Sequence, residues 1–306
     1  MLRYRLLSAV VIICSSLVFV ALDASGWPCE NCTGFWMIPL GAYLIFGSAV
    51  ECTAMCRHTP YGPVERPALL GCGFIMLAAA TPVYWPLSGS VYPVDCPFGK
   101  MGLPLFAGSL SLLGGFVWHM RTYRSGQNEL IRSVLAGWIA SYFGTCFAFA
   151  VSLRQIGTYN WGLYFIVGVI VITKFADAGA YFAGRSLGKN KLCPNVSPGK
   201  TVEGLLGGIL VSIFISWIYF GFFGCRIYQT LHWPWYSHIV LGLTLTLGGV
   251  AGDLLESIFK RDTGLKDSGN LLPGLGGLWD VTDSLLPGFV LAYLIYASGL
   301  TPAPSV

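Results

Sequence analysis

The sequence predicts an all-α, polytopic integral membrane protein with about nine membrane-spanning helices and a cytoplasmic N-terminus. Of its 306 residues, 55% are hydrophobic and 10% are charged, whereas soluble domains carry about 25% charged residues. Its mean hydropathy is +0.66. The scarcity of charge argues against a water-exposed globule or a disordered chain. The net charge of +4 is too small to indicate a nucleic-acid partner.

Each predicted helix is an apolar run close to the roughly 20 residues that cross a bilayer. Nearly every face of these runs is apolar, so length and flanking polar residues set the boundaries. The spans cover residues 6–22, 35–53, 68–86, 103–120, 132–152, 159–180, 204–222, 238–258 and 281–299. The first run follows Arg3 and Arg5 and is also open to interpretation as a signal peptide, although no small-x-small cleavage site follows it.

The basic residues predict the orientation. When the connections are assigned alternately to two sides, all of the 18 Lys and Arg except Lys100, Arg154 and Arg226 fall on one side. Lys and Arg accumulate in short cytoplasmic loops. The N-terminus is therefore predicted to be cytoplasmic and the C-terminus external.

Cys29, Cys32 and Cys96 fall on the predicted external side. Disulfides persist there, and the sequence leaves a disulfide and free thiols equally open.

The acidic residues divide the chain into two predicted regions. Residues 1–130, with about four helices, carry no catalytic motif and are predicted to be a scaffold. Residues 131–306, with about five helices, place several acids in or beside apolar spans, where an unpaired charge costs several kcal/mol. We therefore expect the catalytic site in the second region. No internal repeat of the kind found in transporters is visible.

The first candidate cluster lies in the eighth predicted span. Helical spacing puts Asp253, Glu256, Ser257 and Lys260 on one face. The carboxylates suit a divalent metal, and Lys260 with Arg261 suits a phosphate. The alternative is a structural ion pair of Glu256 with Lys260 above a basic anchor. The position of Asp253, two turns inside the apolar span, favours function.

The second cluster is the glycine-rich segment 266–283. Its glycines allow the backbone to approach a ligand closely. Asp280 and Asp283 are three residues apart, so both can share a metal with Asp253. Alternatively, Asp280 caps the last helix and Asp283 lies in its first turn.

The third cluster joins the segments 177–185 and 197–204. A Walker motif is excluded, because the glycine required five residues before the lysine is absent. Ser197, Lys200 and Thr201 still form a plausible phosphate clamp ahead of a helix. A helix cap of Thr201 with Glu203 is equally open.

These clusters resemble a known family. The C-terminal signature of the phosphatidate cytidylyltransferase (CDP-diacylglycerol synthase) family is matched by Ser257, Lys260, Arg261, Lys266, Asp267, Pro273, Gly276, Gly277, Asp280 and Asp283. The segments 177–185 and 197–204 are also similar to that family. Leu275 and Val281 depart from it, since the family usually has His and Arg there.

The resemblance implies transfer of a cytidylyl group from CTP to phosphatidate, which forms CDP-diacylglycerol and pyrophosphate in phospholipid biosynthesis. From the residues, we expect Asp253, Asp280 and Asp283 to bind Mg²⁺ against the CTP phosphates, with room for a second cation. Substrate-binding residues are Asp177, Ser197, Lys200, Thr201, Glu203 and Ser257. The remaining implied catalytic residues are Lys260, Arg261, Lys266 and Asp267. Among these, Lys200, Lys260, Arg261 and Lys266 would neutralise phosphates, whereas Asp267 and Glu203 would orient those cations.

Several questions stay open. The loss of an arginine at Val281 points either to another lipid phosphate, such as an isoprenoid-ether lipid phosphate, or to a compensating residue such as Lys174. A CTP-dependent lipid kinase and a non-enzymatic transporter are the remaining alternatives. The resemblance further implies a homodimer in a bacterial cytoplasmic membrane, with its active site on the cytoplasmic side.

Overall fold

The computed structural model describes residues 2–27, 33–90, 92–93, 95–121, 123–124, 128–157, 160–228 and 232–302. Its helices are α1 (Leu2–Ala24), α2 (Met37–Cys56), α3 (Glu65–Tyr84), η1 (Trp85–Ser88), α4 (Gly99–Arg121), α5 (Glu129–Arg154), α6 (Trp161–Leu187), α7 (Val202–Ser216), the π-helix η2 (Trp217–Gly224), α8 (Cys225–Ile227), α9 (Trp235–Thr263), α10 (Trp279–Thr282) and α11 (Leu285–Ala297). The two strands are β1 (Lys191–Cys193) and β2 (Ser197–Thr201). The predicted all-α class is confirmed.

Eight helices within the described ranges are long and apolar enough to cross a membrane, and they coincide with the first eight predicted spans. This number is consistent with the prediction of about nine spans. In the predicted ninth span, α10 ends at Thr282 and α11 has 13 residues, fewer than a bilayer crossing needs. The chain is a polytopic integral membrane protein.

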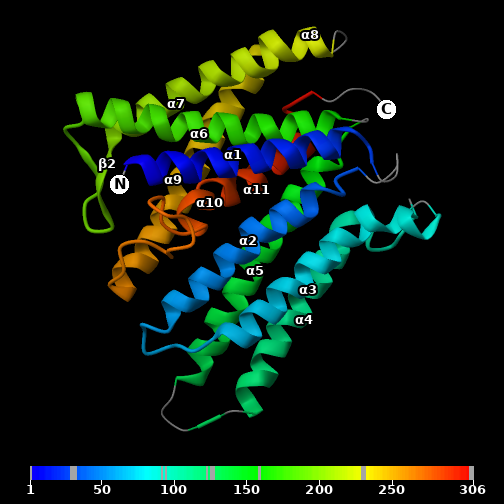
Figure 1. The fold of residues 1–306 in the computed structure, drawn as a ribbon, viewed down its shortest axis with the longest axis vertical. Helices are drawn as coiled ribbons and strands as arrows, with labels where there is room; N and C mark the ends of the chain where they lie inside the picture. The colour runs from blue at the N-terminus through cyan, green and yellow to red at the C-terminus, as the bar shows by residue number, and fades with distance from the viewer. Residues whose placement is uncertain are drawn as a thin grey trace. The chain divides into compact units, whose positions relative to one another are not determined.

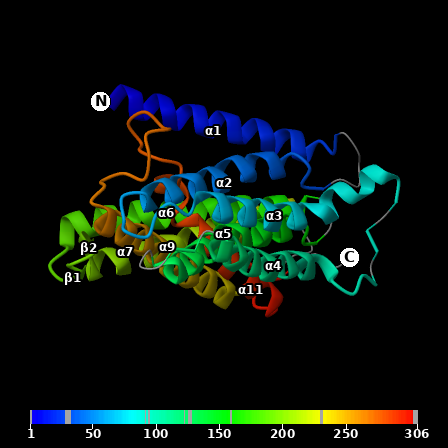
Figure 2. The ribbon, with the colours of Figure 1, turned by 90° about the horizontal axis from the view of Figure 1, so that it is seen from below.

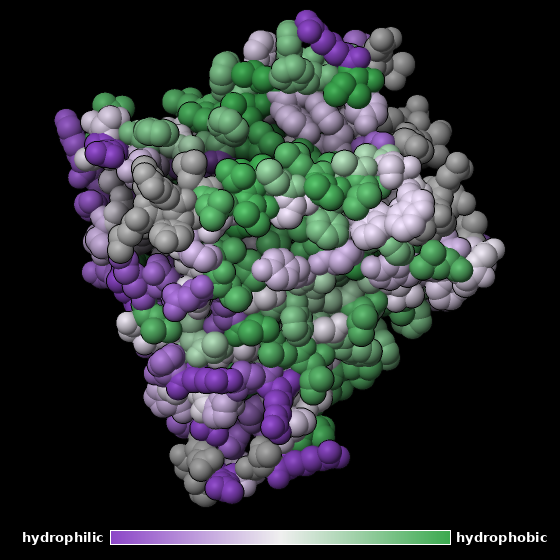
Figure 3. Space-filling view, viewed as in Figure 1, coloured by the Kyte–Doolittle hydropathy of each residue, from purple (hydrophilic) through white to green (hydrophobic). Residues whose placement is uncertain are grey.

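The exposed hydrophobic side chains of the surface are those expected of a protein embedded in lipid. Hydrophobic side chains cover much of the face seen in Figure 3. On α1, Leu7, Val11 and Leu17 are 61%, 59% and 61% exposed. Such extensive exposure of apolar side chains would be costly in water and is favourable in lipid.

The chain forms two compact units. Unit 1 contains residues Met1–Ser152 and Phe259–Thr282, and unit 2 contains Leu153–Ile258 and Asp283–Val306. The glycine-rich segment 264–278 therefore folds together with the N-terminal helices. The predicted functional division at residue 130 stays a prediction.

Close packing of small residues organises unit 1. Helices α3 and α4 lie side by side (Figure 1, Figure 2). At Gly71 of α3, an added Cβ would lie 2.9 Å from Ala140 Cβ and 3.0 Å from Ser111 Cβ. Cys72 and Ile75 beside it are fully buried. Cys72 thus packs as a small hydrophobe.

In unit 2, α6 and α7 pack closely against each other. An added Cβ at Gly179 would lie 2.7 Å from Val211, and one at Gly208 would lie 3.0 Å from the Ala176 carbonyl oxygen. The backbones can approach because these positions lack side chains.

An antiparallel hairpin connects α6 to α7, with Lys191 opposite Thr201. Thr201 caps α7, because its Oγ1 accepts the Gly204 N–H at 3.0 Å. Glu203 does not complete the expected cap but accepts the N–H groups of Lys189 and Asn190 at 3.1 and 3.2 Å. These hydrogen bonds tie the residues just before β1 to the first turn of α7.

Of the cysteines considered for a disulfide, Cys29 and Cys32 lie outside the described residues. Cys96 is a free thiol in the described part of the chain.

The packing of α6 on α7 predicts that Gly179→Ala lowers the free energy of unfolding by about 1–3 kcal/mol, because the methyl group overpacks the contact with Val211. The matched control is Gly114→Ala in α4, where an added Cβ meets nothing within 4 Å. That change should be neutral or stabilise the helix by about 0.5–1 kcal/mol. Thermal unfolding midpoints in detergent measure both, and equal shifts in the two variants would contradict this account of the packing.

Candidate active site

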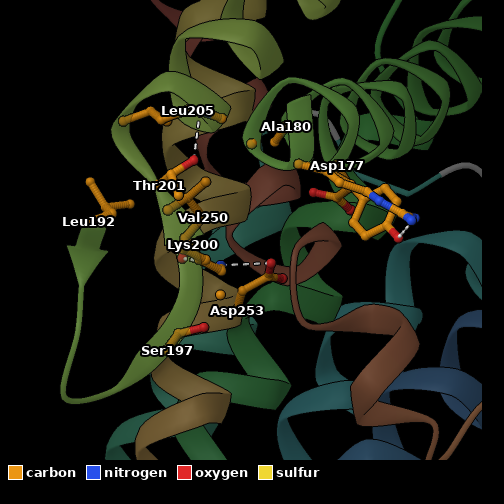
Figure 4. Close-up of a pocket in the computed structure, with 14 residues that line it drawn as sticks. Asp177, Ala180, Leu192, Ser197, Lys200, Thr201, Leu205, Val250 and Asp253 are labelled. Atoms are coloured by element: carbon orange, nitrogen blue, oxygen red, sulfur yellow. Dashed lines mark hydrogen bonds and ion pairs between the residues drawn. The ribbon is translucent and has the colours of Figure 1, made fainter. Parts of the chain in front are cut away.

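A cavity of about 400 Å³ lies within unit 2, bounded by α6, the hairpin, α7 and α9 (Figure 4). Apolar side chains, Leu192, Leu205 and Val250, form part of its wall. Its polar lining consists of Asp177, Tyr181 and Arg185 from α6, Ser197, Lys200 and Thr201 from the hairpin, and Asp253 from α9. The third candidate cluster and Asp253 are therefore brought together at one cavity.

An ion pair is the main polar contact of the cavity. Lys200 Nζ lies 2.8 Å from Asp253 Oδ2 and 3.4 Å from the Val250 carbonyl oxygen (Figure 4). The Lys200 and Asp253 side chains are 22% and 27% exposed. Charges are attracted more strongly in such partly desolvated surroundings than in water. The pair holds strand β2, near the open end of the hairpin, against α9.

A second group of polar side chains surrounds Ser284, just before α11. Lys174 Nζ donates to Ser284 Oγ at 2.9 Å, and Ser284 Oγ donates to Asp177 Oδ2 at 3.0 Å. Lys174 also lies 3.5 Å from Asp177 Oδ2. This network links two residues of α6, one turn apart, to the start of α11.

Asp283 lies beside this network: its Oδ1 accepts the Ser284 N–H at 2.7 Å, and its carboxyl group lies close to that of Asp253. An added Cβ at Gly252 would collide with the Asp283 carbonyl group, so only glycine lets α9 approach here. Two carboxyl groups in contact require a proton or a cation between them.

Unit 1 contains a separate cluster, which we call the loop cluster: Lys260, Ser268, Gly277 and Asp280. Lys260 Nζ donates to Asp280 Oδ1 at 2.5 Å. Asp280 Oδ2 accepts the Gly277 N–H at 2.6 Å, the Ser268 N–H at 3.0 Å and the Ser268 hydroxyl at 2.9 Å. Burial by itself raises the pKa of Asp280, but hydrogen bonds from Lys260 and the two N–H groups outweigh it and hold the pKa below its usual value.

The remaining predicted residues differ in exposure. Arg261, Lys266 and Asp267 are exposed, and Ser257 of α9 is half-buried. Asp280 is the second residue of α10 and accepts the N–H of Gly277, which precedes the helix, so it does not occupy the N-cap position expected of it. Asp283 lies between α10 and α11 rather than in the first turn of α11.

A metal site of three carboxylates is not assembled within either unit. Among the described residues, no group of three or more His, Cys, Asp or Glu side chains is gathered as metal ligands. Asp253 and Asp283 belong to unit 2 and Asp280 to unit 1. Asp253 and Asp283 offer carboxylate oxygens, the ligand type that a hard cation such as Mg²⁺ prefers, whereas the Asp280 oxygens already accept hydrogen bonds from protein groups.

Sequence reasoning missed Ser284 and Glu51. Ser284 is fully buried and links Lys174 to Asp177. Glu51 lies in α2 and is 5% exposed. A carboxylate inside an apolar span was the available signal for Glu51, the same signal that pointed to Asp253.

Comparison with known proteins gives a consistent result. The model of the cytidylyltransferase family matches residues 3–298. A protein of Bacillus subtilis named phosphatidate cytidylyltransferase is 40% identical over 161 residues, which cover 53% of this chain and 56% of the relative. A protein of the same name from Haemophilus influenzae is 41% identical over 124 residues, 40% of this chain and 42% of the relative. In these comparisons the chain spans about half the length of the relatives.

The hydrogen bonds to Asp280 predict a pH effect on stability. A depressed carboxyl pKa contributes stability that is fully present above the unfolded-state pKa of about 3.9 and is lost as the pH falls through the folded-state pKa. The free energy of unfolding should therefore fall between about pH 5 and pH 3, and Asp280→Asn should flatten this dependence.

Unfolding in detergent at a series of pH values measures how the free energy of unfolding depends on pH. Asp267→Asn, which alters an exposed carboxylate of the same segment, is the control and should retain the wild-type slope. An identical slope in Asp280→Asn and the wild type would contradict the assignment.

Proposed function

This chain belongs to the cytidylyltransferase family, and we propose that it transfers the cytidylyl group of CTP to phosphatidate. A phosphate oxygen of phosphatidate attacks the α-phosphorus of CTP. A new P–O bond forms, the bond from the α-phosphorus to the bridging oxygen breaks, and pyrophosphate leaves with that oxygen. The products are CDP-diacylglycerol and pyrophosphate. The observation that carries the proposal is the cavity in which Lys200 faces Asp253, in a chain that matches the family along almost its whole length.

The chemistry requires positive charge more than a general base. The attacking phosphate is already ionised near pH 7, so no strong base is needed. The absence of a histidine at Leu275 is compatible with this requirement. Two polyanions must approach each other, so cationic groups placed in advance lower the barrier most effectively.

Lys200 is suited to this task. Its amine lies at an otherwise partly apolar cavity and is held by one carboxylate. A substrate phosphate can take the place of Asp253 as the partner of Lys200, and that exchange frees the Asp253 carboxylate. Ser197 and Thr201, on the same strand, supply hydroxyl groups to the phosphate, with Asp177 and Arg185 completing the polar wall.

Mg²⁺, when bound, would supply further positive charge against the CTP phosphates and would be held by Asp253 and Asp283, with Asp280 as the third expected ligand. A second cation could share this set. Glu203 fastens the hairpin that carries Lys200. We assign Lys260, Arg261 and Lys266 to phosphate neutralisation and Ser257 to hydrogen bonding, with Asp280 orienting the Lys260 amine and Asp267 acting on the neighbouring cations.

We further propose that Lys174 replaces the positive charge that the family usually has at the position of Val281. Its amine is held by Ser284 and Asp177, beside Asp283. The lipid would enter through the bilayer while CTP arrives from the cytoplasm, in agreement with the side to which most Lys and Arg are assigned. A homodimer in a bacterial cytoplasmic membrane is part of the same proposal.

The test uses purified protein in detergent with Mg²⁺, CTP labelled at the α-phosphate, and phosphatidate. Label in the lipid together with an equal amount of pyrophosphate supports cytidylyl transfer. Phosphorylated lipid with CDP and no pyrophosphate would establish a lipid kinase instead. If phosphatidate gives no product, an isoprenoid-ether lipid phosphate is tested next, and the absence of product with any lipid phosphate contradicts the proposal.

Lys200→Met should lower kcat/KM by about 10²–10³-fold, because the apolar side chain fills the space but cannot neutralise a phosphate. Arg57→Gln is the matched control, since Arg57 is an exposed cation that pairs with Glu65, and its kcat/KM should stay within about twofold of the wild type. Initial rates at several CTP concentrations measure both. An unchanged Lys200→Met rate would remove Lys200 from the site.

The metal assignment predicts that Asp253→Asn and Asp283→Asn each raise the Mg²⁺ concentration needed for half-maximal activity by about tenfold or more. Titrating Mg²⁺ at saturating CTP measures this. Full turnover and an unchanged Mg²⁺ requirement in Asp280→Asn would show that Asp280 is not a metal ligand.

A further inference from the structure

A buried carboxylate of α2, Glu51, contacts the C-terminal signature segment, residues 257–283, directly. Glu51 is 5% exposed, yet its two oxygens accept three hydrogen bonds. Oε1 accepts the Leu278 N–H at 2.9 Å, and Oε2 accepts the Trp279 N–H at 2.9 Å and the Ser268 hydroxyl at 3.0 Å. All of these groups belong to unit 1. No role in the proposed reaction has so far been assigned to Glu51.

The segment is shaped to close on this carboxylate. An added Cβ at Gly269 would lie 2.5 Å from Glu51 Oε1, and one at Gly277 would collide with Glu51 Oε2. Both positions therefore need glycine for the backbone to reach Glu51.

The same face of α2 makes other contacts with this segment. Ser48 Oγ hydrogen-bonds to Thr282 Oγ1 at 2.8 Å. At Gly47, four residues before Glu51, an added Cβ would collide with the Leu278 side chain. The α2 face at residues 47, 48 and 51 is thus complementary to segment 268–282.

Ser268 links Glu51 to the loop cluster. Its hydroxyl lies 3.0 Å from Glu51 Oε2 and 2.9 Å from Asp280 Oδ2. A hydroxyl has one proton, so the two carboxylates share a single donor. Ser268 is itself buried, and hydrogen bonds are strongly coupled in such low-dielectric surroundings. A displacement of Glu51 must therefore displace the group that holds Asp280.

We infer that Glu51 is a positioning residue for the cytidylyl transfer proposed above, on which this inference rests. Glu51 fixes Ser268 and the backbone at Leu278 and Trp279. These groups fix Asp280, and Asp280 orients the Lys260 amine toward a substrate phosphate. Displacements of about 1 Å at a reacting centre cost about 10²-fold in rate. Glu51, although distant in the sequence from Asp280 and Lys260, thereby affects the rate of cytidylyl transfer.

The site requires a carboxylate rather than an amide. Glu51 accepts two backbone N–H groups, one on each oxygen. A glutamine has one acceptor oxygen, and its NH₂ group would face a backbone donor. Glu51→Gln has nearly the same shape as the wild type, so it changes the hydrogen bonds and little else.

The experiment compares the full-length wild type with Glu51→Gln, Ser268→Ala and the double variant in detergent. Glu65→Gln is the matched control, because Glu65 is a carboxylate of α3 that pairs with Arg57 on the surface. Rates are expressed per CTP-binding site counted by equilibrium binding, so a smaller folded fraction does not lower kcat. Hydrogen exchange of segment 268–280 is measured on the same samples.

For Glu51→Gln and Ser268→Ala we expect kcat to fall by about 10²-fold, with KM for CTP and phosphatidate within about threefold of the wild type. The double variant should be no slower than the slower single variant, because both changes break the same link. Exchange of segment 268–280 should accelerate in Glu51→Gln but not in Glu65→Gln.

Overturning results are a kcat of Glu51→Gln within about twofold of the wild type, additive effects in the double variant, or unchanged exchange. If Glu51→Gln does not fold, Ser268→Ala decides, since it removes only the bridging hydroxyl, and an unchanged kcat there overturns the inference. If the wild type transfers no cytidylyl group, the proposed function fails. Hydrogen exchange then still decides whether Glu51 holds the segment.

Discussion

An ionised side chain within an apolar helix bundle needs donors or opposite charges supplied by the protein, because lipid supplies none. The local structure around each buried acid follows from this constraint. Asp253 in α9 is held by Lys200 from the hairpin, Asp177 in α6 by Lys174 and Ser284, and Asp280 by Lys260 and backbone N–H groups. Lys174 lies one turn from Asp177 on the same helix. The other partners come from a different segment of the same unit, so these contacts also hold segments of the fold together.

These contacts also suit the proposed chemistry. A lysine held by a carboxylate is already desolvated and oriented, so a substrate phosphate can replace the carboxylate with little further reorganisation. The two units provide different versions of this arrangement. In unit 2, Lys200 faces a cavity and is held by one carboxylate. In unit 1, Lys260 is held by Asp280, whose other oxygen is fixed by the loop backbone.

Glycine is the second requirement of the fold, because at some positions only the absence of a side chain lets two segments come into contact. Gly252 lets α9 approach Asp283, and Gly277 lets the loop close on Glu51. A methyl group at either position would collide with the group that it must approach. Gly269 and Gly277 of segment 266–283 therefore contact Glu51, and the expected approach of this segment to a ligand stays a prediction.

The sequence by itself determined the class of the protein and the location of eight spans, and it provided the candidate residues for the proposed chemistry. These follow from composition, run length and residue type, which are local properties. Only the tertiary structure decided that the last predicted span is broken before α11, that Asp280 accepts hydrogen bonds from Ser268 and Gly277, and that Glu51 of the presumed scaffold holds the signature segment. Glu51 and Leu278 are 227 positions apart, and no pattern in a single sequence records which distant donors a buried carboxylate will meet, because that depends on how the helices pack.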